Sequence, residues 1–115
     1  GIRVTLDVDT GASTHEVKFY TSTDDGTTWT QLGTTLATAG TTSIHPGTSP
    51  LYIGSHANNN YQMTGMVRRV EIRDGINGTI VAAPDFTAPM GPRMRDAQGN
   101  ICTINGSAWA WGLAA

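Results

Sequence analysis

Carboxylates are the side chains of this 115-residue chain that come closest to a catalytic arrangement. Asp7 and Asp9 are separated by one residue in an alternating segment, so both would lie on one face of a strand, about 7 Å apart. Such a pair suits general acid–base catalysis, a calcium site or a plain solvated face. We favour the solvated face, because nothing in the sequence supplies a pocket that would raise a carboxyl pKa. Calcium at Asp7 and Asp9 is the one metal alternative.

The two glutamates do not supply a better pair. Glycoside hydrolysis uses two carboxyl groups about 5 to 10 Å apart across the bond that is cleaved. Glu16 and Glu71 fall in different predicted strands, and Glu71 stands in an arginine-rich stretch, so a surface ion pair is its expected role. We therefore expect no catalytic residues and no enzymatic activity.

Histidine and cysteine spacing argues against zinc and against a catalytic thiol. His15, His45 and His56 show neither the His-x-His nor the His-x-x-x-His spacing of metal ligands. Cys102 is the single cysteine, so an internal disulfide is excluded, and its apolar surroundings favour a small buried side chain. No cofactor is expected.

A turn between two alternating segments contains the most specific motif. Residues 22–29 read S-T-D-D-G-T-T-W, which matches the S-x-D-x-G-x-T-W pattern called an Asp-box. The carboxylate can accept hydrogen bonds from backbone amides of its own turn, the glycine can adopt a positive φ, and the indole can cover the hairpin. We predict a structural role for its residues, which are Ser22, Asp24, Gly26, Thr28 and Trp29. The motif occurs once, which argues against a propeller of repeated blades.

A loop rich in asparagine offers a binding site of a different kind. Asn58, Asn59 and Asn60 supply amides that can hydrogen-bond a sugar, and Tyr61 supplies a ring that can stack on one. An exposed turn without a ligand is the competing interpretation, because asparagine is common in turns.

Composition excludes two classes of partner. The net charge is -2 and Lys18 is the only lysine, so there is no basic patch of the kind that nucleic acid requires. There is no run of about 18 apolar residues, so no membrane-spanning helix is predicted. Abundant threonine and the 14 glycines are typical of β-proteins, many of them extracellular or in virions.

Alternating hydrophobicity predicts an all-β fold of short strands without helices. Residues 2–9 and 15–22 alternate most cleanly. The longest pattern covers residues 62–74, where a break in phase near Arg68 indicates a bulge. Further strands are predicted at residues 28–32, 41–45, 51–55, 79–83, 101–104 and 107–111, with a short one near Thr35.

Turn residues at 74–78 and 105–106 predict hairpins between consecutive strands. The chain is therefore predicted to be a single antiparallel β-sandwich domain over residues 1–115, with a closing hairpin region at residues 87–115.

The order of these segments resembles the concanavalin A-like, or laminin-G-like, jelly-roll family, in versions found in phage and actinobacterial structural proteins. The resemblance is carried by residues 3–7 (RVTLD), 17–33 (VKFYTSTDDGTTWTQLG), 51–54 (LYIG) and 65–75 (GMVRRVEIRDG). Residues 96–100 and 104–109 resemble the closing hairpin of the same group. The family domain has about 200 residues, and this chain is similar to its second half.

The resemblance implies a non-enzymatic structural or adhesion β-sandwich of a phage virion or bacterial surface protein, with glycan binding as an added role. We expect its location to be the virion, the extracellular space or the cell surface. A half-domain would expose an apolar sheet face and unpaired edges. We therefore expect an oligomer or a larger assembly, completed by other structural subunits, by the missing half-domain or by a second copy. The alternatives are a carbohydrate-binding module of a glycoside hydrolase and a fragment of a catalytic glycosidase.

Overall fold

The computed structural model describes residues 1–56, 61–87 and 91–104. Within these residues the chain forms seven antiparallel β-strands and no helix. The predicted all-β, antiparallel class is therefore confirmed, while the jelly-roll sandwich stays a prediction. Across the described residues we find no helix with the length and apolar character needed to cross a membrane. The fold divides into two units, one of Gly1–Gly47 with Gly75–Asn77 and one of Thr48–Asp74 with Gly78–Ala115.

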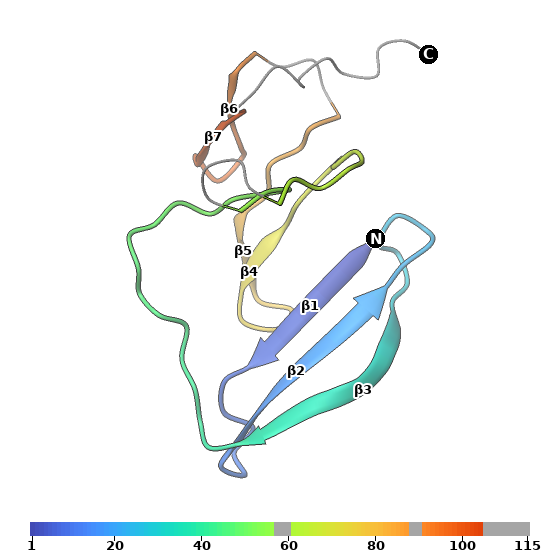
Figure 1. The fold of residues 1–115 in the computed structure, drawn as a ribbon, viewed down its shortest axis with the longest axis vertical. Helices are drawn as coiled ribbons and strands as arrows, with labels where there is room; N and C mark the ends of the chain where they lie inside the picture. Colours follow the sequence, from blue (N-terminus) through green and yellow to red (C-terminus); the bar gives the residue numbers. More distant parts are fainter. Residues whose placement is uncertain (57–60, 88–90, 105–115) are drawn as a thin grey trace. The chain divides into compact units, whose positions relative to one another are not determined.

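The first unit is built on a three-stranded antiparallel sheet. Its strands are β1 (Ile2–Asp7), β2 (Thr14–Thr21) and β3 (Thr30–Ala39), in the order β1-β2-β3 (Figure 1). β1 and β2 form where the sequence alternates between apolar and polar residues. β1 ends two residues earlier than predicted, because the Asp7 carboxylate accepts the backbone amide of Asp9 and turns the chain there.

β3 is one continuous strand, although the sequence predicted a break near Gly33. The strand stays paired because it carries an irregularity in its register. Val17 pairs with Leu36, and Phe19 pairs with Leu32. The two pairs are therefore two residues apart on β2 and four residues apart on β3. Gly33 has a φ of +72°, which glycine adopts at little cost. The irregularity adds an even number of residues, so Leu32 and Leu36 remain on the same face of the sheet.

One face of this sheet is apolar. Cross-strand partners share a face, and Val4 lies opposite Phe19 as Leu6 lies opposite Val17. We call this set the apolar sheet face; its members are Ile2, Val4, Leu6, Val17, Phe19, Leu32 and Leu36. The charged residues of β1 and β2 alternate with these positions and belong to the opposite face. They are Arg3, Asp7, Glu16 and Lys18.

The second unit contains two hairpins. One pairs β4 (Ile72–Asp74) with β5 (Thr79–Ala82), and the other pairs β6 (Arg93–Arg95) with β7 (Ile101–Thr103). The predicted turn at residues 74–78 is confirmed, since Asp74 pairs with Thr79 across it. Gly75 and Asn77 have positive φ angles there, as a tight hairpin turn requires.

Several predicted strands in the second half are wrong. Of residues 62–74 only β4 is a strand, preceded by a single bridge between Arg69 and Asp85. The expected bulge near Arg68 is instead a register shift between Ile72 and Arg73. Residues 41–45 and 51–55 form no strand. A short apolar run becomes a strand only where another strand lies beside it and pairs with it. The predicted hairpin at residues 105–106 and strand at 107–111 lie outside the described residues.

Candidate functional site

The turn that joins β2 to β3 is held by the carboxylate of Asp24. Its Oδ1 accepts the backbone amide of Thr28 at 2.9 Å and the hydroxyl of Ser22 at 2.7 Å. Its Oδ2 accepts the hydroxyl of Thr28 at 2.6 Å. The Ser22 hydroxyl also accepts the amide of Gly26 at 2.9 Å, and Ser22 is buried. Four of the motif residues therefore form one hydrogen-bond network, in which every bond spans four positions or fewer.

Gly26 and Trp29 complete this turn. Gly26 has a φ of +86°, which disfavours any residue with a Cβ. A Cβ at Gly26 would also lie 3.2 Å from Cζ2 of Trp29, and one at Gly1 would lie 3.1 Å from Cη2 of the same ring. The half-buried indole therefore lies against both glycines and shields the turn from water.

Hydrogen bonding also sets the charge state of Asp24. The Thr28 hydroxyl, the Thr28 amide and the Ser22 hydroxyl, in that order, hold the pKa of Asp24 well below its usual range. The carboxylate therefore stays ionised near neutral pH and acts as an acceptor. A general acid needs the opposite shift. The geometry suits a structural clamp, and the assignment of these residues to the Asp-box class stays a prediction.

Asp7 and Asp9 do not share a strand face, contrary to the sequence prediction. Asp7 is the last residue of β1, and Asp9 lies in the following turn. Asp9 Oδ1 accepts the amide of Gly11 at 2.9 Å, and Asp7 Oδ1 accepts the amide of Asp9 at 3.2 Å. Both carboxylates thus hold the turn, as short side chains with acceptors commonly do. Among the described residues, no three His, Cys, Asp or Glu side chains gather in a way that could hold a metal ion.

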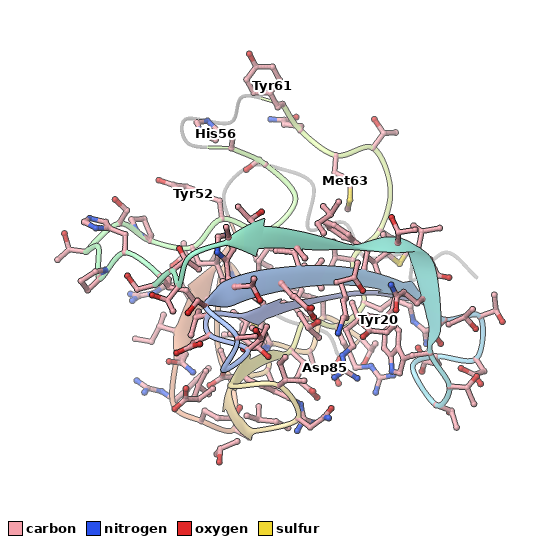
Figure 2. The ribbon with its side chains drawn as sticks, turned by 90° about the horizontal axis from the view of Figure 1, so that it is seen from below. Tyr20, Tyr52, His56, Tyr61, Met63 and Asp85 are labelled. Atoms are coloured by element: carbon pink, nitrogen blue, oxygen red, sulfur yellow. The ribbon has the colours of Figure 1, made fainter. Side chains whose placement is uncertain are left out.

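The predicted glycan loop is only partly described. Asn58, Asn59 and Asn60 lie outside the described residues. Tyr61 is 90% exposed and has a positive φ of 53°. Its ring meets that of His56 edge to face, with centroids 6.3 Å apart and an angle of 74° between the planes (Figure 2). The loop therefore presents one aromatic ring to solvent.

A second carboxylate clamp, at Asp96, has no counterpart among the predicted site residues. Asp96 Oδ1 accepts the amides of Gln98 at 3.1 Å and Asn100 at 2.7 Å, and Oδ2 accepts the amide of Ala83 at 2.9 Å. Asn100 Nδ2 donates to the carbonyl of Val81 at 2.8 Å. These bonds tie the β6–β7 hairpin to β5. The signal was an aspartate followed by glycine and asparagine three and four positions later.

Two ion pairs join residues two positions apart in the chain, and the single thiol is partly buried. Lys18 Nζ lies 2.9 Å from Glu16 Oε2, and Arg73 pairs with Glu71, which confirms the ion pair expected for Glu71. Burial, together with the charge of Asp96, raises the pKa of the Cys102 thiol. A thiol with a raised pKa is a poor nucleophile.

No family model, curated protein or solved structure matches the chain.

Proposed function

We propose that the chain is a non-enzymatic structural β-module that serves architecture or adhesion in a phage virion or on a bacterial surface. The observation that carries the proposal is the use of its carboxylates. Asp24 and Asp96 each accept several hydrogen bonds from turn amides and neighbouring side chains. Groups engaged in this way stabilise hairpins, whereas catalytic carboxyls need a free lone pair aimed at a substrate.

Two further observations support a structural role for the carboxylates. Asp85 accepts both the hydroxyl and the amide of Thr87, and these bonds lower the pKa of Asp85. The two glutamates are engaged in ion pairs with basic residues two positions along the chain. These carboxylates thus contribute to local structure, as expected of a structural module.

Surface labelling tests this proposal directly. An antibody against the β2–β3 hairpin would be applied to purified phage particles and to intact cells of the organism that encodes the chain. We expect labelling of particles or of the cell surface, with a matched peptide of scrambled sequence as the competitor control. Signal confined to the soluble fraction of lysed cells, in organisms that make the protein, would contradict the proposal.

Glycan binding is the second candidate function, and the exposed ring of Tyr61 is the observation that favours it. A ring with one free face can stack on a pyranose, and His56 beside it limits the orientations that Tyr61 adopts. This role fits an adhesion module and equally a carbohydrate-binding module of a glycoside hydrolase.

A glycan array compares the wild type with Tyr61→Ala. We expect binding to one class of glycan and its loss in the variant. Tyr52→Ala is the matched control, since Tyr52 is another exposed tyrosine of the same unit, without the His56 contact (Figure 2). Absence of binding across arrays would remove this candidate and leave the structural proposal standing.

A further inference from the structure

The turn between β4 and β5 contains an Asn-Gly dipeptide that has no part in the functions proposed above. Asn77 and Gly78 are the last two residues before β5 begins at Thr79. An asparagine side chain that is followed by glycine can react with its own backbone, because glycine has no Cβ to hinder the approach of its amide nitrogen. The dipeptide is therefore a candidate site of spontaneous chemical modification.

The amide nitrogen of Gly78 is available as the nucleophile. Within the described part of the chain, no acceptor takes the N–H of Gly78. The glycine of the Asp24 turn differs, since the N–H of Gly26 donates to Ser22 Oγ at 2.9 Å. A nitrogen held in this way must lose its hydrogen bond before it can turn toward a side chain. Gly78 needs no such step.

The side-chain carbonyl of Asn77 is polarised for attack. Arg3 Nη2 donates to Asn77 Oδ1 at 2.6 Å, and the two residues belong to the same unit. A cationic donor on a carbonyl oxygen draws electron density from the carbon and stabilises the negative charge that forms on the oxygen during attack. The contact with Arg3 therefore favours addition at Cγ of Asn77.

The backbone of this turn can change conformation locally. Asn77 has a φ of +58°, in the left-handed region that residues with a Cβ populate sparsely. β4 and β5 have only 3 and 4 residues, and a hairpin of two short strands is marginally stable by itself. Local opening of the turn therefore allows the nitrogen of Gly78 to reach Cγ of Asn77.

We propose that Asn77 is a site of spontaneous deamidation. The nitrogen of Gly78 loses its proton to hydroxide and attacks Cγ of Asn77. A bond forms between these two atoms, the Cγ–Nδ2 bond breaks, and Nδ2 leaves as ammonia with a proton from water. Water then opens the resulting succinimide ring at either of its carbonyls, which gives aspartate or isoaspartate at position 77.

The reaction changes the charge of the turn and, in one product, its backbone. Each converted molecule exchanges a neutral amide for a carboxylate, so its net charge changes from -2 to -3. In the isoaspartate product the main chain runs through the former side chain, so the turn becomes longer by one methylene group. Because the reaction needs only water, both products should accumulate with the age of the protein.

Peptide mapping of the full chain after incubation in mildly alkaline buffer tests the proposal. Tryptic cleavage after Arg73 and Arg93 releases residues 74–93, in which Asn77 is the only asparagine. We expect this peptide to gain the mass difference between an amide and a carboxyl group. Electron-transfer fragmentation should show both aspartate and isoaspartate at position 77.

Asn100 is the internal control. It is followed by the β-branched Ile101, which hinders attack, and its Nδ2 donates to the carbonyl of Val81 at 2.8 Å. Asn100 should therefore keep its amide while Asn77 loses it.

Two variants test the roles of the neighbouring groups. Gly78→Ala places a Cβ beside the nucleophile and should slow conversion roughly fivefold or more. Arg3→Ala removes the donor to Oδ1 and should slow conversion to a smaller extent. Circular dichroism of each variant reports whether the β-structure persists.

The chain unfolded in urea is the reference for the folded turn and requires no variant. We expect Asn77 of the folded protein to convert within roughly tenfold of the unfolded rate. Loss of the amide in the unfolded chain alone, conversion of Asn100 as fast as Asn77, or an unchanged rate in Gly78→Ala would each overturn the proposal. None of these results would alter the surface labelling, so failure of this proposal and failure of the proposed function are distinguishable.

Discussion

Asp24 and Asp96 begin two turns with the same local hydrogen bonds. In each turn the carboxylate accepts the amide of the residue four positions on, at 2.9 Å from Thr28 and 2.7 Å from Asn100. In each, the side chain of that residue also donates to the carboxylate, and the backbone carbonyl of the aspartate accepts the amide three positions on.

The two turns differ in what lies beyond these local bonds. Every bond of Asp24 stays within residues 22–28, and the turn is completed by the indole of Trp29. Asp96 and Asn100 instead reach β5, through the amide of Ala83 and the carbonyl of Val81. The Asp24 turn is a self-contained clamp, and the Asp96 turn is a link between two hairpins.

The largest expected effect comes from breaking the link. Asp96→Ala should accelerate amide exchange both in its own turn and at Ala83, roughly 100-fold or more, because the charged acceptor of both segments is lost. Asp24→Ala should accelerate exchange at Thr28 and leave segments outside its turn unchanged. Hydrogen exchange followed by NMR measures both. If Ala83 exchanges at the wild-type rate in Asp96→Ala, the described difference between the two turns is wrong.

Removal of the indole should be the next largest effect. Trp29→Ala deletes a half-buried aromatic side chain, so we expect a loss of about 2 to 3 kcal/mol in the free energy of unfolding. Trp29→Phe keeps part of the contact and should lose about half as much. Urea denaturation at constant protein concentration measures both. Equal losses from the two variants would show that the contact area of the ring is not what stabilises the turn.

A matched pair of glycines separates backbone strain from the indole contact. Gly26 and Gly11 have similar φ angles of +86° and +81°, but a Cβ at Gly11 meets nothing within 4 Å. Gly11→Ala should therefore cost about 1 kcal/mol from the left-handed backbone alone, and Gly26→Ala about 1 to 2 kcal/mol. The same urea titration decides. Equal losses of stability in the two variants would show that the Trp29 ring does not contact a Cβ at position 26.

The smallest effect is the dependence of stability on pH. Hydrogen bonds from Thr28 and Ser22 lower the folded-state pKa of Asp24 below its unfolded value of about 3.9. The stabilisation is then complete above that value and is lost as pH falls below it toward the folded-state pKa. Asp24→Asn should flatten the fall in stability below about pH 4 relative to the wild type. The free energy of unfolding would be measured from pH 7 down to about pH 2 for both proteins. Identical pH dependence in the wild type and in Asp24→Asn would contradict this role of Asp24.

Features set by neighbouring residues were predictable from the sequence, whereas contacts between distant segments were not. The alternation of residues 2–9 and 15–22 located β1 and β2 because a two-residue period is visible without a partner. The spacing from Ser22 to Trp29 revealed a turn because every acceptor lies within reach of its own amides.

The Asp96 link was not predictable in the same way. Ala83 and Val81 lie 13 and 19 positions from their partners, and no periodicity connects them. The strand predicted at residues 62–74 failed for a related reason. Its apolar residues fit a strand, but pairing within it is limited to the Arg69 bridge and β4.

The irregularity in β3 constrains how this strand can vary in length. Leu36 lies on the same face of the sheet as Leu32 only because the irregularity adds an even number of residues between them. Deleting one residue there would reverse the orientation of everything from Leu36 to Ala39, whereas deleting two would not. Natural variants of this hairpin should therefore gain or lose residues at Gly33 in pairs.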